Sequence, residues 1–130
     1  MELDSVYQLN LKAKILEEKI SNLKDAQKNL TPVLDGLPKS RSVGSKVEGL
    51  TVAIMTLESE LSALREEMVK SAVELATLIT SKVPTPAARI LIARYVGCQP
   101  FKKIIAAEHY SAAHVFYLHK QGVKKFKETI

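Results

Sequence analysis

Apolar residues recur at helical spacing along the first third of the chain. A leucine stands at every seventh position, and the positions between complete the stripe: Leu9, Ala13, Leu16, Ile20, Leu23, Gln27, Leu30 and Leu34. This alternation of three and four predicts a long amphipathic helix from Leu3 to about Leu30. We expect Pro32 to end or kink that helix near Leu30, because proline lacks a backbone donor and clashes with the preceding turn.

A second apolar stripe begins after a stretch rich in glycine, proline and serine. Residues 35–46 contain Gly36, Pro38 and Gly44 and are predicted to form a loop. The stripe itself predicts a helix from about Val47 to Lys82, followed by two prolines that stop it. Its apolar series is interrupted only by Ser71: Val47, Leu50, Ile54, Leu57, Leu61, Leu64, Met68, Leu75 and Leu78.

The two stripes can be buried in either of two ways. They can pack against each other as an antiparallel hairpin within one chain, or one or both can pair with a second chain. Two helices make a thin core in either case, so residues 1–83 are expected to form a helical hairpin that also mediates homo-oligomerisation.

Three shorter helices are predicted in residues 84–130. The first begins at Thr85 or Pro86, with proline at an early helical position, and ends at a turn over 96–100. The second spans about 100–107. The third starts after Ser111, a good N-cap, and continues to about Phe126. Gly122 lies inside the third helix and weakens it by about 1 kcal/mol relative to alanine. The predicted fold class is therefore all-α.

Positive charge is confined to this last segment. Residues 1–83 hold 11 basic and 12 acidic residues, whereas residues 84–130 hold 8 basic and 2 acidic ones. The whole chain carries a formal charge of +5, so its excess charge comes from the C-terminal helices. A basic surface of this kind is typical of a protein that meets a polyanion.

The spacing of the short helices is that of a helix-turn-helix. Such a motif needs apolar residues on its first helix, a turn that tolerates positive φ, and an apolar anchor on the recognition helix. Ile104, the turn at 108–110 and the anchors Val115 and Leu118 meet these needs. We therefore predict a helix-turn-helix DNA-binding domain over 84–130.

The same segment resembles the sigma-factor region 4-like domain of small phage and prophage transcriptional regulators of the ArpU and RinA type. The resemblance rests on the pair Arg94-Tyr95, on Phe101 to Ile104, on Tyr110-Ser111 and on the run VFYLH from Val115 to His119. The long helix, the loop with a leucine-proline pair and the second long helix are similar too. The resemblance implies a DNA-binding activator that uses no cofactor.

The chain departs from that family at the turn and on the recognition helix. His109 stands where a turn glycine is usual, Ile105 where alanine is usual, and Glu108 where an apolar residue is usual. Ala112 and Ala113 replace polar side chains at exposed positions. The recognition surface is therefore poor in the Arg, Asn and Gln side chains that read base edges.

Two kinds of DNA contact are predicted on double-stranded DNA. Ser111, Ala112, His114 and Tyr117 lie in the first two turns of the recognition helix, where they can reach base edges. The lysines are better suited to phosphates, whose contacts set affinity and register. The residues expected to bind phosphate are Lys102, Lys103, Lys120, Lys124, Lys125 and Lys127.

Other classes of site have little support in the sequence. His109, His114 and His119 recur every five residues and cannot line one face of a helix, so no metal site is expected. Cys98 has no histidine or carboxylate arranged for nucleophilic catalysis, and we expect no enzyme. No apolar run is long enough to cross a membrane and the first ten residues lack the features of a signal peptide, which favours a cytoplasmic protein.

Two hypotheses from different classes follow. In the first, the chain is a transcriptional regulator whose helix-turn-helix docks on DNA. In the second, the alanine-rich recognition face binds a protein instead, such as RNA polymerase or another regulator. A coiled-coil scaffold is a third possibility, which explains the long helices but not the basic segment.

Overall fold

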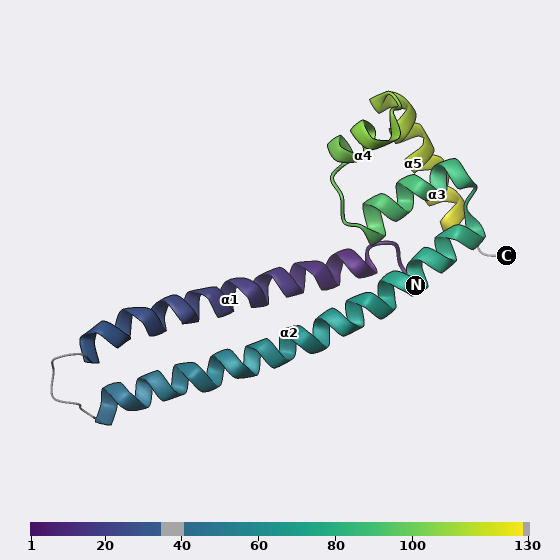
Figure 1. The fold of residues 1–130 in the computed structure, drawn as a ribbon. Helices are drawn as coiled ribbons and strands as arrows, with labels where there is room; N and C mark the ends of the chain where they lie inside the picture. Colours follow the sequence, from purple (N-terminus) through teal and green to yellow (C-terminus); the bar gives the residue numbers. More distant parts are fainter. Residues whose placement is uncertain (35–40, 129–130) are drawn as a thin grey trace. The chain divides into compact units, whose positions relative to one another are not determined.

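A computed structural model describes residues 1–34 and 41–128, and every regular element in these two ranges is a helix. The fold is all-α, with a long hairpin of two helices followed by three short packed helices, as predicted (Figure 1). In chain order the elements are α1 (Ser5–Leu34), α2 (Arg41–Lys82), α3 (Thr85–Leu91), the π-helix η1 (Ile92–Val96), α4 (Phe101–Glu108) and α5 (Ala112–Lys127).

The contacts within the chain divide it into two compact units. We call Leu11–Glu66 the hairpin unit, and Met1–Asn10 together with Glu67–Ile130 the core unit. Both dividing points fall inside the long helices α1 and α2. The functional boundary expected between residues 83 and 84 stays a prediction.

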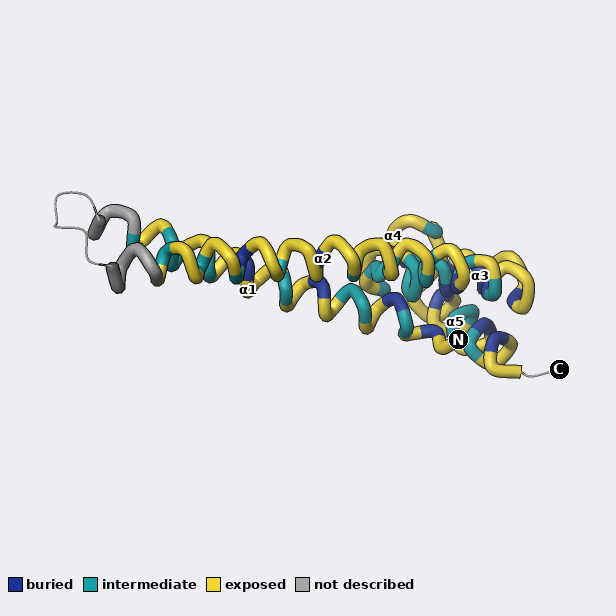
Figure 2. Tube along the Cα trace, turned by 90° about the horizontal axis from the view of Figure 1, so that it is seen from below, coloured by how far each residue is buried: buried dark blue, intermediate teal, exposed yellow. Residues whose placement is uncertain are grey.

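In the hairpin unit the two apolar stripes pack against each other within a single chain. Ala13 and Ile20 from α1, and Ile54 and Leu61 from α2, are its buried hydrophobic residues among those described. They lie at the core positions of the heptad pattern. In Figure 2 these buried positions recur at intervals along helices that are otherwise largely exposed. Of the two arrangements that the sequence left open, the structure contains the intrachain hairpin.

Polar contacts across the hairpin fix its antiparallel register. Because the hydrogen-bonded and charged side chains are exposed, each pair adds only a few tenths of a kcal/mol, up to about 1 kcal/mol. Gln27 Nε2 donates to Thr51 Oγ1 at 2.6 Å, and ion pairs join Lys24 to Glu58 at 3.2 Å and Arg65 to Glu17 at 2.7 Å.

Two predicted helix boundaries were wrong. Helix α1 continues past Pro32 to Leu34. The proline then lies in the last turn, where it costs one hydrogen bond near carbonyls that the helix end leaves unpaired in any case. Helix α2 begins at Arg41 rather than near Val47, because extending an existing helix through a glycine costs only about 1 kcal/mol. The rest of the predicted loop, residues 35–40, lies outside the described residues.

The core unit buries a continuous apolar cluster contributed by distant parts of the sequence. Leu3 and Val6 from the start of the chain pack with Leu75 and Ile79 of α2. The same cluster contains Val83, Ala87, Ala88 and Leu91 of the α3 region and Phe126 of α5. A second cluster joins the three short helices through Ile90, Ile104 and Val115, whose exposed fractions are 0%, 1% and 0%. This second cluster is the apolar centre that a helix-turn-helix requires.

Gly122 allows α5 to approach α3 closely. A Cβ atom at this position would lie 3.0 Å from Leu91 Cδ1 and 3.2 Å from Ala87 Cβ. The sequence predicted only that a glycine weakens the helix. The structure shows what the glycine permits, which is the close crossing of α3 and α5.

Candidate nucleic-acid interface

The turn between α4 and α5 has the geometry expected of a helix-turn-helix. His109 ends α4 in the left-handed region, with φ 59° and ψ 24°. Ser111 then caps α5, its Oγ accepting a hydrogen bond from the His114 backbone N–H at 3.1 Å. The prediction of the cap and of a positive φ near this turn is confirmed. A hydroxyl that accepts this bond still has a proton to donate.

The unusual residues around the turn are accommodated by contacts in the core unit. Glu108, expected to be out of place, keeps only 14% side-chain exposure and pairs with Arg89, whose Nη2 lies 3.3 Å from its Oε2. Ile105 packs beside the second apolar cluster as a half-buried residue. The close approach that a small residue usually provides on this helix is provided between α3 and α5 by Gly122.

One face of α5 points away from the core. The buried residues Val115, Gly122 and Phe126 define its inner side. Residues spaced four and three apart on the opposite side share one outward face: Ala113, Tyr117, Lys120 and Lys124. All four are exposed, and Tyr117 is 56% exposed. A polar ligand that docks on α5 would meet this face.

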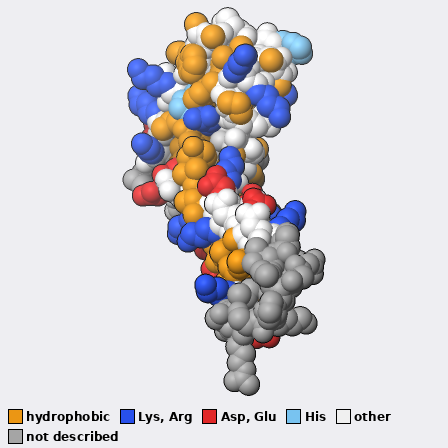
Figure 3. All heavy atoms as spheres, turned by 90° about the vertical axis from the view of Figure 1, so that its left-hand side faces the viewer, with side chains coloured by type: hydrophobic (Ala, Val, Ile, Leu, Met, Phe, Trp, Pro, Cys, Tyr) orange, Lys and Arg blue, Asp and Glu red, His pale blue; other side chains and the backbone are white. Residues whose placement is uncertain are grey.

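The predicted contact residues fall on the surface of the core unit. Ser111, Ala112 and His114 are exposed in the first turn of α5, and Lys120 and Lys124 follow on later turns. Lys102 and Lys103 are exposed in the first turn of α4. In the upper part of Figure 3, formed by the short helices, lysine and arginine side chains lie among hydrophobic ones.

Several basic residues of the segment already make contacts within the chain. Arg94 Nη1 donates to the Gln99 carbonyl at 3.1 Å, and its guanidinium lies 4.5 Å from the centre of the Phe101 ring. Lys125, predicted to bind phosphate, lies 3.6 Å from a carboxylate oxygen of Glu128. Both side chains of that pair are about half exposed, so water weakens it.

The sequence did not predict how many aromatic rings contact one another here. On the side of α5 that faces α4, Phe101 contacts Phe116 and His119, with ring centres 5.0 and 5.1 Å apart. His119 Nε2 also lies 2.7 Å from the hydroxyl of Tyr95. We call these four residues the inner aromatic cluster. It connects η1, α4 and α5 and supports the orientation of α5.

A second group of rings lies on the exposed side of the same helix. Tyr110 and His114 have ring centres 4.7 Å apart at an interplanar angle of 81°, and His114 and Tyr117 have centres 6.4 Å apart at 20°. We call these three the outer aromatic row. Tyr110 was missed as a candidate contact residue, although its position directly before the N-cap could have suggested it.

Burial changes the titration of two members of the inner cluster. Burial raises the pKa of Tyr95 above its usual 10.0; the positive charge of Arg94 opposes the rise and the carboxylate of Asp4 adds to it. Burial, and then the positive charge of Arg94, lowers the pKa of His119 below its usual 6.5. Both partners of this hydrogen bond are therefore neutral at pH 7.

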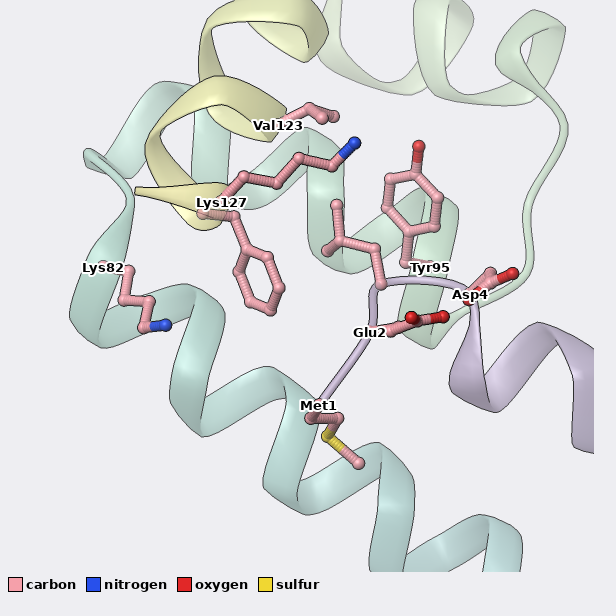
Figure 4. Close-up of a pocket in the computed structure, with 9 residues that line it drawn as sticks. Met1, Glu2, Asp4, Lys82, Tyr95, Val123 and Lys127 are labelled. Carbon is pink, nitrogen blue, oxygen red and sulfur yellow. The ribbon is translucent and has the colours of Figure 1, made fainter. Parts of the chain in front are cut away.

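A cavity of about 630 Å³ lies elsewhere on the core unit (Figure 4). Leu3, Tyr95, Val123 and Phe126 give it apolar walls, and the Lys82 ammonium lies 5.2 Å from the centre of the Phe126 ring. Its remaining lining residues are Met1, Glu2, Asp4, Lys82 and Lys127. The lining side chains include two carboxylates and two ammonium groups, so together the side chains carry no net charge.

Residues 1–34 and 41–128 contain neither a candidate metal site nor a candidate membrane span. Within those ranges no group of three or more His, Cys, Asp or Glu side chains is arranged to hold a metal ion. The helices described there also include none long and apolar enough to span a membrane.

Comparison with known protein families, with curated proteins and with solved structures finds no match to this chain.

Proposed function

We propose that this chain is a non-enzymatic, DNA-binding transcriptional regulator of the phage or prophage type, which acts in the cytoplasm without a cofactor. Its helix-turn-helix would dock α5 on double-stranded DNA. The observation that carries the proposal is the capped helix α5, which presents an exposed face with lysines. It lies in residues 84–130, which hold 8 basic and 2 acidic residues.

Lysines would supply most of the affinity. Lys120 and Lys124 lie on the outward face of α5, one helical turn apart, and Lys102 and Lys103 are exposed at the start of α4. A lysine is a flexible point charge, suited to phosphate oxygens and indifferent to the base sequence. This arrangement favours binding that depends strongly on salt.

Contacts to bases would come from the first two turns of α5. Ser111, His114 and Tyr117 can exchange hydrogen bonds with base edges, and the Ala112 methyl can contact a thymine methyl. These are weaker readers than arginine or glutamine. We therefore expect modest sequence discrimination relative to the non-specific affinity.

The test is a salt titration of duplex DNA binding by the full chain. Each phosphate contact contributes a slope of about 0.9 to the fall of log affinity with log salt. The triple variant Lys102→Glu, Lys103→Glu, Lys124→Glu should lower the slope by about 3. Absence of binding to any duplex at low salt would sink the proposal. The full chain is needed because Leu3, Val6, Leu75 and Ile79 complete the core.

A second function is favoured by the hydrophobic surface of α5. Phe116 is 48% exposed and Tyr117 56% exposed, and exposed aromatic residues are enriched where proteins meet. In this alternative, the helix binds RNA polymerase or another regulator. The same triple variant separates the two functions: loss of both DNA binding and promoter activity supports the first, and unchanged promoter activity supports the second.

We also propose that the hairpin unit joins two or more copies of the chain. Beyond the stripe used inside the hairpin, Val52 and Met55 remain 63% and 65% exposed on α2. A second copy could cover them. Light scattering should give a mass above 14.4 kDa that falls to the monomer value in Val52→Glu, Met55→Glu. A monomeric mass for the unmodified chain would contradict this.

A further inference from the structure

The outer aromatic row is exposed although its rings could have been used for packing. Tyr110 is 39% exposed and Tyr117 is 56% exposed, and His114 between them is exposed as well. The three residues lie outside both buried clusters of the core unit. A row of flat rings presented to solvent on the proposed recognition helix needs a ligand with a flat face.

Two of these rings lie nearly parallel. His114 and Tyr117 are tilted by only 20°, and their centres are 6.4 Å apart. Proteins that bind single strands stack successive bases on exposed aromatic rings, and each such ring offers a face to a base. Both side chains are exposed, so their rings have room to adjust to a base.

The charges around the row suit a nucleic-acid strand. Lys120 and Lys124 share the outward face of α5 with Tyr117. A basic surface that follows the backbone, combined with aromatic rings that stack on bases, is the common design of proteins that bind single strands.

A paired duplex would leave these rings without a matching surface. Inside a duplex the flat faces of the bases are covered by their neighbours, and only base edges reach the groove. Those edges are read by Arg, Asn and Gln, which are absent from residues 111–120 of α5. Unpaired bases would expose the faces that the row can stack on.

We propose that the outer aromatic row stacks on unpaired DNA bases while Lys120 and Lys124 hold the neighbouring phosphates. This inference rests on the proposed function, because it specifies which form of DNA the core unit prefers. The target is then a strand with locally unpaired bases, bound by the same helix that would dock on the duplex.

The test uses the full chain and fluorescence anisotropy with three probes: a duplex, the same duplex with a central run of mismatches, and one of its strands alone. Tyr117→Leu keeps an apolar side chain but removes the ring. It should weaken binding to the mismatched and single-stranded probes by roughly 5- to 150-fold, the range for one base stacked on one aromatic residue. Binding to the paired duplex should fall several-fold less than binding to the unpaired probes, since lysine–phosphate contacts supply most of the duplex affinity and remain in the variant.

Tyr7→Leu is the matched control, because it removes an exposed ring of the same type from α1, outside both groups of aromatic rings. It should leave the affinity for all three probes within about 2-fold, because only a ring that stacks on a base contributes to single-strand affinity. An equal loss with Tyr117→Leu on paired and unpaired probes would overturn the inference, and so would an equal loss with Tyr7→Leu. Duplex binding without single-strand binding would overturn it and leave the proposed function standing. No binding to any probe would overturn the proposed function itself.

Discussion

The hairpin unit and the core unit bury their apolar residues by different geometries. In the hairpin unit, two helices share one narrow seam, and its buried residues Ile20, Ile54 and Leu61 each keep 7% exposure. In the core unit, helices cross at several points, and Leu75 and Ile90 have 0% exposure. A heptad stripe can thus make a helix pair, but a closed core requires segments from distant parts of the sequence.

The two units also differ in their surfaces. The hairpin unit has side chains of both charges joined in exposed ion pairs, and such pairs add little to stability. The core unit combines a closed apolar centre with a surface rich in lysine. The orientation of α5 depends on that centre, since Ile104 and Val115 join α4 to α5.

The largest expected difference is in the stability lost when either of two leucines of α2 is truncated to alanine. Leu75→Ala should destabilise the core unit by about 3–5 kcal/mol, because the buried cavity it creates cannot collapse fully. Leu61→Ala should destabilise the hairpin unit by about 1–3 kcal/mol, since water and neighbouring side chains can fill a site at the edge of a thin seam. Native-state hydrogen exchange of amides in each unit measures both losses of unfolding free energy. Equal losses would show that the two units are packed equally well.

Two glycines distinguish the units further, because replacing each by alanine should change stability in opposite directions. Gly49 has nothing within 4 Å of an added Cβ, so Gly49→Ala should stabilise α2 by about 0.5–1 kcal/mol through helix propensity. Gly122→Ala should destabilise by about 1 kcal/mol, because crowding against Leu91 and Ala87 exceeds that gain. Thermal unfolding of the two variants gives the signs. A stabilising Gly122→Ala would show that the helices can move apart at little cost.

The smallest expected effect is a dependence of stability on pH that is confined to the core unit. His119 has a lower pKa folded than unfolded, so the unfolded chain binds a proton more readily. Stability should therefore fall as pH drops below about 6.5 and level off below the folded pKa. His119→Gln removes this titration. Melting temperatures between pH 7 and pH 5 should fall less in the variant, and an identical fall would exclude His119 as the cause.

Local signals predicted the short helices well. The Ser111 cap, the prolines at the start of α3 and the turn at His109 act within a few residues, so their effect can be read from neighbouring positions. The heptad stripes likewise predicted which side of each long helix is buried. They did not specify intrachain pairing, because the same pattern also suits a partner chain.

The features that were missed depend on residues far apart in the sequence. Tyr95 meets His119 across 24 positions, and Gly122 acts by admitting Leu91 of another helix. Neither contact has a local signature. Lysines and the helix start suggested the candidate site. The row of Tyr110, His114 and Tyr117 was missed although its spacings of four and three are local.

Under the proposed function, DNA binding belongs to the lysines of the core unit and not to those of the hairpin unit. The direct test compares duplex affinity at one low salt concentration for two triple variants of equal charge change. Lys102→Glu, Lys103→Glu, Lys124→Glu should lose roughly 100-fold in affinity, because phosphate contacts become repulsive. Lys12→Glu, Lys14→Glu, Lys19→Glu should stay within about 3-fold, since under the proposal these lysines make no phosphate contact that could be lost. An equal loss in both, or a larger loss in the hairpin variant, would contradict the account.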